Sequence, residues 1–109
     1  PEDRAPAFVA AYDSGRALFV REQRVRDADA ALYSKRLEIA RLEDRIARGA
    51  FQVISETATP EERTQGVLDT KQAAERIGRL KAEIAALEKE RARYAQELDA
   101  YRATVADVR

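Results

Sequence analysis

The sequence contains no cysteine, no histidine and no tryptophan, and its 109 residues include only four glycines and three prolines. The absence of cysteine excludes disulfides and thiol nucleophiles, and the absence of histidine excludes the usual zinc sites and imidazole-based triads. No run of about 18 apolar residues occurs, so no segment is long enough to span a bilayer. The sequence also lacks an initiating methionine and a signal peptide, which indicates a processed or shortened form of a longer precursor.

Charge of one sign is lacking as well, because 20 Lys and Arg residues balance 20 Asp and Glu residues. A net charge of zero gives the chain no general attraction for nucleic acid or for anionic membranes, so neither is expected as a main partner. Hydrophobic residues make up 45% of the sequence, yet aromatic residues make up only 6% and charged residues 37%. This composition is typical of long helices packed in a thin layer.

Motifs for catalysis are absent: the sequence has no Gly-rich phosphate loop, no GxSxG, no HExxH and no EF-hand pattern. Carboxylate pairs such as Glu61 with Glu62, or Glu88 with Glu97, can act as acid and base only in a concave and partly dry site. A thin helical layer offers no such site. We therefore expect no catalytic residues, no metal, no cofactor and no enzymatic activity.

Apolar residues recur in alternating steps of three and four along a first long segment, which is the spacing of heptads on a helix. Lys35 and Gly49 fill the remaining seam positions. The start of this segment carries an aromatic end, Phe8, Tyr12 and Phe19. We expect a helix from about residue 7 to 52, with a seam formed by Val25, Ala28, Leu32, Ile39, Leu42, Ile46 and Val53.

A second segment, from about residue 60 to 107, keeps the same alternation over five heptads and predicts a supercoiled helix. Arg91 is its one charged seam residue. We expect Arg91 to form an ion pair at the seam edge, with ligand binding as the alternative, and the tyrosines to pack with their hydroxyls in solvent. The other seam residues are Ala73, Ile77, Leu80, Ile84, Leu87, Tyr94, Leu98, Tyr101, Val105 and Val108.

Residues 53–59 are expected to form the turn between these helices. Thr59 is a good N-cap, Pro60 suits the first helical position, and Glu62 completes a capping box. Two helices of similar length joined by a short turn must pair antiparallel to bury their seams, so we predict an all-α, two-helix coiled-coil hairpin as a single domain. With the turn centred at Thr57, the numbers of facing residues sum to about 114.

This register places Tyr101 opposite Tyr12, and Arg91 near Glu22. It also lines up two outer stripes that together form a candidate dimer face. Because a two-helix hairpin buries only one stripe per helix, we expect a second copy to pack there and make a dimeric four-helix bundle. The candidate face comprises Ala30, Tyr33, Leu37, Ala40, Gly78, Ala82 and Ala85.

Several apolar residues bracket the turn. One interpretation is that they close the end of the hairpin by packing across the loop. The alternative is that they remain exposed and grip apolar segments of client proteins, as a holdase-like chaperone or secretion adaptor does. The residues concerned are Phe51, Val53, Ile54, Val67 and Leu68.

The stretch Phe8, Tyr12, Gly15, Leu18 and Phe19, followed by charged heptads and a Thr-Pro-Glu-Glu-Arg turn, resembles the C-terminal part of a family of proteobacterial envelope lipoproteins of unknown function. In that family a Tyr/Gly-rich part with a cysteine precedes the Phe-x-x-x-Tyr-x-x-Gly-x-x-Leu-Tyr/Phe stretch. The present sequence lacks that part and any lipid-attachment site. The resemblance therefore implies a lipid anchor only for a longer precursor, and it implies no activity.

Taken together, these features predict a non-enzymatic structural or protein-interaction module of the bacterial cell envelope that self-associates through helical seams. The expected partners are a second copy and an envelope protein. The resemblance implies a periplasmic or outer-membrane-associated location, while a cytoplasmic one stays open. The chaperone or adaptor described above is the alternative function.

Overall fold

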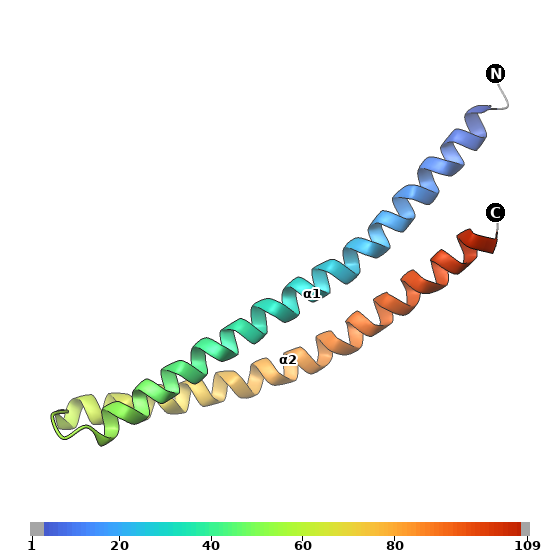
Figure 1. Ribbon diagram of the computed structural model, residues 1–109. Coiled ribbons are helices and arrows are strands. Elements are labelled where there is room, and N and C mark those ends of the chain that lie inside the picture. The colour runs from blue at the N-terminus through green and yellow to red at the C-terminus, as the bar shows by residue number, and fades with distance from the viewer. Residues whose placement is uncertain (1–3, 108–109) are drawn as a thin grey trace. The chain divides into compact units, whose positions relative to one another are not determined.

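The computed structural model describes residues 4–107, with side chains described for residues 10–106. Two α-helices, α1 (Arg4–Ile54) and α2 (Pro60–Asp107), are joined by a short connection at residues 55–59 (Figure 1). Within residues 4–107 there is no β-strand. The chain is thus an all-α helical hairpin, as the heptad spacing predicts.

Helix α1 is longer at both ends than the predicted range of 7 to 52. Pro6 is accommodated in its first turn, where a missing N–H removes no hydrogen bond of the helix. At the other end, the carbonyl oxygen of Ser55 accepts hydrogen bonds from Ala58 N at 3.3 Å and from Arg63 Nη2 at 3.1 Å. These two bonds close the turn directly after Ile54.

Helix α2 begins at a reciprocal pair of capping bonds. The backbone N–H of Glu62 donates to Thr59 Oγ1 at 3.1 Å, and the backbone N–H of Thr59 donates to Glu62 Oε1 at 3.4 Å. Pro60 is the first helical residue. These bonds satisfy amide groups that no helical carbonyl can reach, so they fix where the helix starts.

The paired helices form two compact units. The loop unit is Ala31–Ala86 and contains the connection, while the terminal unit combines Pro1–Ala30 with Leu87–Arg109. In the loop unit Arg45 pairs with Asp69 and Lys35 pairs with Glu83. Residue numbers therefore rise along one helix as they fall along the other, so the two segments run antiparallel.

Few side chains are fully buried. Leu80 is completely inaccessible, and the other buried hydrophobic residues of the loop unit are Leu32, Ala73 and Ile77. In the terminal unit, only Ala28 and Leu98 are buried among the described side chains. The hydrophobic core of each unit is therefore a single seam, and among the described side chains fewer are buried in the terminal unit than in the loop unit.

The observed pairs refine the predicted register. In the loop unit, Arg45–Asp69 and Glu38–Arg76 follow it closely. In the terminal unit, Arg24 pairs with Glu97 where the register predicts residue 90, a difference of seven residues or about two helical turns. Side chains lean toward the N-terminus of their own helix, so long side chains in an antiparallel pair meet at higher residue numbers, and this lean contributes to the difference.

Candidate functional site

The two helices of the loop unit approach each other closely at Gly49 of α1 and Gly66 of α2. A Cβ atom at Gly49 would stand 2.7 Å from Thr70 Oγ1 and 3.1 Å from the carbonyl oxygen of Gly66. A Cβ atom at Gly66 would stand 3.1 Å from the carbonyl oxygen of Gly49. Both glycines are buried. They let the two backbones come close, and a methyl group at either position would force its neighbours to shift.

Gly66 and Thr70 are seam residues that the heptad pattern did not predict, although Gly49 was placed in the seam. The signal was available, because Thr70 and Gly66 continue the repeat three and seven residues before Ala73. Neither residue is apolar enough to stand out in a hydrophobic pattern. Thr70 Oγ1 donates to the carbonyl oxygen of Gly66 at 2.8 Å, which satisfies its hydroxyl in the seam.

The predicted seam residues face the interior of their own unit. Six predicted seam side chains are buried: Ala28, Leu32, Ala73, Ile77, Leu80 and Leu98. Gly49 is buried as well, and one member, Val108, lies outside the described residues. The remaining predicted seam side chains are half-buried: Val25, Lys35, Ile39, Leu42, Ile46, Val53, Ile84, Leu87, Arg91, Tyr94, Tyr101 and Val105.

Charged residues flank the seam of the loop unit and pair across the helices. Lys35 Nζ lies 2.9 Å from Glu83 Oε2, and Arg76 Nε donates to Glu38 Oε1 at 3.0 Å. The hydrogen bond from Lys35, followed by its charge, lowers the pKa of Glu83 below the ordinary value of 4.5. The hydrogen bond to Glu38 raises the pKa of Arg76. These pairs favour this helix pairing modestly, because all four side chains are solvent-accessible.

Arginine side chains lie against tyrosine rings in the terminal unit, both between the helices and within α2. Arg21 Cζ lies 4.5 Å from the ring centroid of Tyr101, and Arg93 Cζ lies 5.2 Å from that of Tyr94. Arg24 approaches the ring of Tyr94 at 5.9 Å. Such cation–π contacts contribute about 0.5–1 kcal/mol each at exposed sites. They partly replace the apolar contacts that this unit lacks.

Arg91 forms an ion pair at the seam edge, but its predicted partner was wrong. Its Nε donates to Asp29 Oδ1 at 3.0 Å. Glu22, the predicted partner, is approached by Arg102 at 3.6 Å and by Arg26 at 3.9 Å. The partner has moved seven residues along α1, and the lean of long side chains toward each helix N-terminus contributes to this shift.

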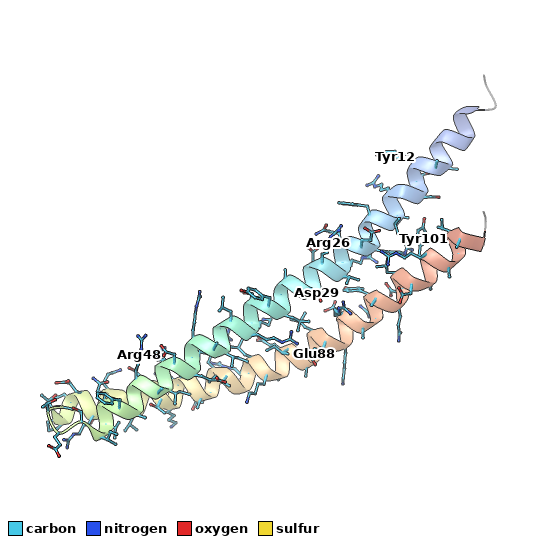
Figure 2. The ribbon with its side chains drawn as sticks, in the orientation of Figure 1. Tyr12, Arg26, Asp29, Arg48, Glu88 and Tyr101 are labelled. Carbon is cyan, nitrogen blue, oxygen red and sulfur yellow. The ribbon has the colours of Figure 1, made fainter. Side chains whose placement is uncertain are left out.

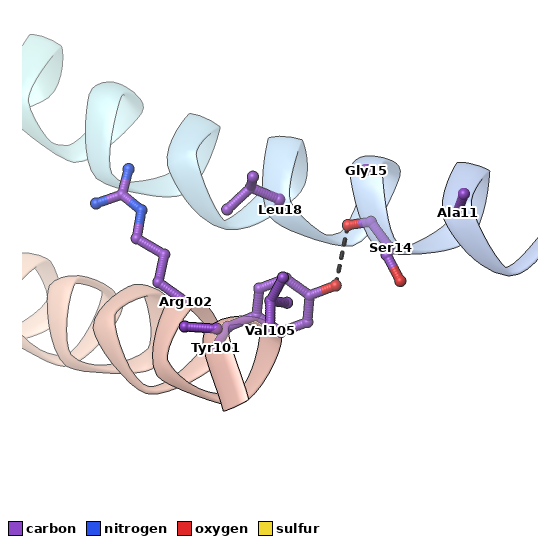
Figure 3. Close-up of a pocket in the computed structure, with 8 residues that line it drawn as sticks. Ala11, Ser14, Gly15, Leu18, Tyr101, Arg102 and Val105 are labelled. Carbon is purple, nitrogen blue, oxygen red and sulfur yellow. Dashed lines mark hydrogen bonds between the residues drawn. The ribbon is translucent and has the colours of Figure 1, made fainter. Parts of the chain in front are cut away.

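A shallow groove of about 480 Å³ lies between the two helices of the terminal unit (Figure 3). The ring of Tyr101 reaches across it, and its hydroxyl donates to the carbonyl oxygen of Ser14 at 2.9 Å. This bond contradicts the expectation that the hydroxyl points into solvent. The groove is mostly apolar and is lined by Ala11, Ser14, Gly15, Leu18, Tyr101, Arg102, Val105 and Ala106.

The aromatic end does not pack into the seam as predicted. Tyr12 is 63% exposed and Phe19 is 59% exposed, and Figure 2 shows Tyr12 on the side of α1 away from α2. The side chain of Phe8 lies outside the described side chains. Phe19 is approached by Arg26, with Cζ 5.9 Å from the ring centroid. Because Tyr12 and Phe19 occupy one heptad position that faces away from the seam, a single hairpin cannot bury them.

All seven residues of the candidate dimer face are exposed in the single chain. Tyr33 is 70% exposed and Leu37 is 38% exposed. On α2, a Cβ atom at Gly78 would meet nothing within 4 Å. The surface is therefore accessible to another molecule.

The turn-proximal apolar residues are also exposed, which contradicts packing across the loop. Phe51, Ile54 and Val67 are 70%, 76% and 55% exposed. Leu68 is exposed too, whereas Val53 is half-buried near Gly66. The glycine contact explains this result, because it closes the seam before the loop and leaves these side chains no partner inside the hairpin.

The described part of the chain was compared with the requirements of a metal site and of a membrane-spanning helix. No group of three or more acidic, histidine or cysteine side chains there could hold a metal ion. Neither helix, over its described residues, is long and apolar enough to cross a membrane.

Comparison with known proteins does not assign the chain to a family. No protein-family model matches it, and no curated protein or solved structure is significantly similar to it.

Proposed function

We propose that this chain is a non-enzymatic structural or protein-interaction module of the bacterial cell envelope that self-associates through helical seams. The observation that carries the proposal is the amount of surface the single hairpin exposes. Its accessible surface is 8392 Å² for a mass of 12.2 kDa. A globular monomer of that mass exposes about 6,100 Å².

The difference, about 2,300 Å², is comparable to what one subunit of an obligate dimer buries, roughly 1,000–2,500 Å². Among the described side chains, nine large hydrophobic ones are exposed, including Tyr33, Phe51 and Ile54. Burial of such side chains stabilises an assembly by about 1.5–3 kcal/mol each. Self-association is therefore favoured over a monomer, and the resemblance of the Phe8–Phe19 stretch to envelope lipoproteins supports the location.

Sedimentation equilibrium over a range of concentrations, up to tens of micromolar, tests the association. We expect a dimer, and we expect Leu37→Glu to shift the species toward monomer because it places a charge on an exposed apolar stripe. A monomer at all concentrations, with no effect of Leu37→Glu on stability, would contradict the proposal. Fractionation of cells that produce the full-length protein tests the envelope location.

A second candidate function is a holdase-like chaperone or secretion adaptor. The specific observation in its favour is the exposure of Phe51, Ile54, Val67 and Leu68 around the loop. Exposed apolar residues gathered near one end of a helical hairpin can bind apolar segments of a client.

An aggregation assay with an unfolded client tests this second candidate. The matched pair of variants is Phe51→Ser and Tyr33→Ser, because both side chains are 70% exposed and both lie on α1. A chaperone that acts at the loop loses activity in Phe51→Ser and keeps it in Tyr33→Ser, with helicity unchanged in both. An intact hairpin that protects no client from aggregation rules this function out.

A further inference from the structure

Helix α1 carries a second heptad seam in the loop unit, on the side away from α2. Its members follow each other in steps of four and three without a break, and every one of them is exposed. Only Asp44 among them is charged, and Asp44 already pairs with Arg48 at 2.9 Å. We name this set the outer seam: Tyr33, Leu37, Ala40, Asp44, Ala47, Phe51 and Ile54.

The seam that faces α2 differs from the outer seam in its exposure to solvent. The inner positions of the same stretch of α1 are all buried or half-buried. Each outer position lies one or two residues after an inner one, which is about 100–200° around the helix. The outer seam therefore points away from α2. The inner positions are Leu32, Lys35, Ile39, Leu42, Ile46, Gly49 and Val53.

Over its described side chains, helix α2 has no comparable seam. Of the nine exposed large hydrophobic residues among side chains 10–106, seven lie on α1 and two, Val67 and Leu68, lie on α2. Val67 and Leu68 are adjacent in sequence and so point in directions about 100° apart. The outer positions Gly78, Ala82 and Ala85 offer little apolar area. Any helix that docks through a heptad seam gains far more on α1 than on α2.

We infer that the outer seam of α1 binds the outer seam of a second copy of this chain, so that two α1 helices form the centre of the dimer. This inference rests on the proposed self-association and names its surface. A helix face whose residues follow each other in steps of four and three packs best against another helix with the same spacing. A second copy supplies one, and the chain exposes about the extra area that such a dimer buries.

The outer seam also suits pairing with itself. Small residues, Ala40 and Ala47, lie on either side of Asp44 in the middle of the outer seam, and larger ones, Tyr33, Leu37 and Phe51, lie toward its ends. In an antiparallel two-fold arrangement centred between Ala40 and Asp44, Leu37 of one copy faces Ala47 of the other, and Tyr33 faces Phe51. The leucine then fills the space beside a small residue, and the two aromatic rings pack against each other.

Single-cysteine variants test the inference cleanly, because the chain has no cysteine of its own. Ala40→Cys lies in the outer seam, and Ala82→Cys is the matched control on the outer side of α2; both positions are exposed alanines within helices. With a short bismaleimide we expect covalent dimers from Ala40→Cys, and at least fivefold fewer from Ala82→Cys.

A second pair of variants tests whether the dimer uses the outer seam, as distinct from whether a dimer forms at all. We expect Phe51→Glu to weaken dimerisation at least tenfold in sedimentation and Leu68→Glu to leave it within twofold. A dimer that crosslinks through Ala82→Cys and resists Phe51→Glu overturns this inference but leaves the proposed self-association standing. A monomeric wild type overturns both, and then a helix of a different protein is the remaining occupant of the outer seam.

Discussion

Gly49 and Gly66 sit in seam positions that elsewhere hold leucine or isoleucine, and the contact they make is between backbones. Neither has a positive φ. These glycines matter because they lack a Cβ atom, and not because they adopt a backbone conformation that other residues avoid. At the other two glycines, Gly15 and Gly78, an added Cβ atom would meet nothing within 4 Å. All four glycines lie in helices, but only Gly49 and Gly66 are needed for the close approach of the helices.

Substitution by alanine separates these roles. We expect Gly78→Ala to stabilise the hairpin by about 0.5–1 kcal/mol, the gain in helix propensity over glycine. Gly49→Ala gains the same propensity, but its methyl group would meet Thr70 and the backbone of Gly66, and such overpacking costs about 1–3 kcal/mol. A net loss is therefore expected. Urea unfolding measures both, and equal stabilisation by the two variants would show that the helices separate easily at Gly49.

The Lys35–Glu83 pair predicts a dependence of stability on acid pH. Because the pKa of Glu83 is lowered in the folded chain, the ionised carboxylate contributes stability above its ordinary pKa of 4.5. That contribution is lost as the pH falls from about 4.5 through the lower folded pKa. We expect Glu83→Gln to flatten this part of the profile of unfolding free energy against pH. Glu75→Gln, at an exposed position on the same helix, should flatten it less.

At the scale of the element, the start of α2 depends on one hydroxyl. Thr59→Ala removes the acceptor for the backbone N–H of Glu62, and loss of an N-cap costs about 0.5–2 kcal/mol. We expect Thr59→Ala to lower stability by about 1 kcal/mol and Thr59→Ser to leave it nearly unchanged. Chemical unfolding of both variants checks this. If Thr59→Ala were neutral, the Arg63–Ser55 bond would suffice to define the turn.

The two units should also differ in their response to salt. The terminal unit buries only Ala28 and Leu98 among its described side chains and relies on pairs such as Asp29–Arg91. At about 1 M salt, the screening length falls to about 3 Å and exposed pairs weaken. We expect amide hydrogen exchange to quicken in the terminal unit and to change little around Leu80. Equal acceleration in both units would show that ion pairs are not what holds the terminal unit.

The sequence predicted the helices well, because heptad spacing and a capping box are local signals. Leu32 and Leu80 were assigned to the seam, and both are buried. The exposure of Tyr12 was not predicted, and that of Phe51 was only one of two interpretations, because an apolar pattern shows which positions are hydrophobic and not whether a partner helix covers them. Gly66 was not predicted as a seam residue, because glycine has no side chain and a hydrophobic pattern therefore gives no signal for it.

For the molecule as a whole, the proposed self-association predicts that stability depends on protein concentration. Mass action stabilises a dimer that forms only from folded chains, so the melting temperature should rise with protein concentration. We expect a measurable rise across a hundredfold range in wild type and a smaller rise in Phe51→Glu. A melting temperature independent of concentration would mean that the single hairpin is stable by itself.

The glycine contact has a further consequence for the order of folding. Sixteen residues separate Gly49 from Gly66, five of them in the connection, so their contact closes a shorter loop than the pairings nearer the termini and costs less chain entropy. Each later pairing then extends an existing pair of helices by one turn. We expect a chain with this layout to begin folding beside its loop and to pair toward its termini, with unfolding in the reverse order.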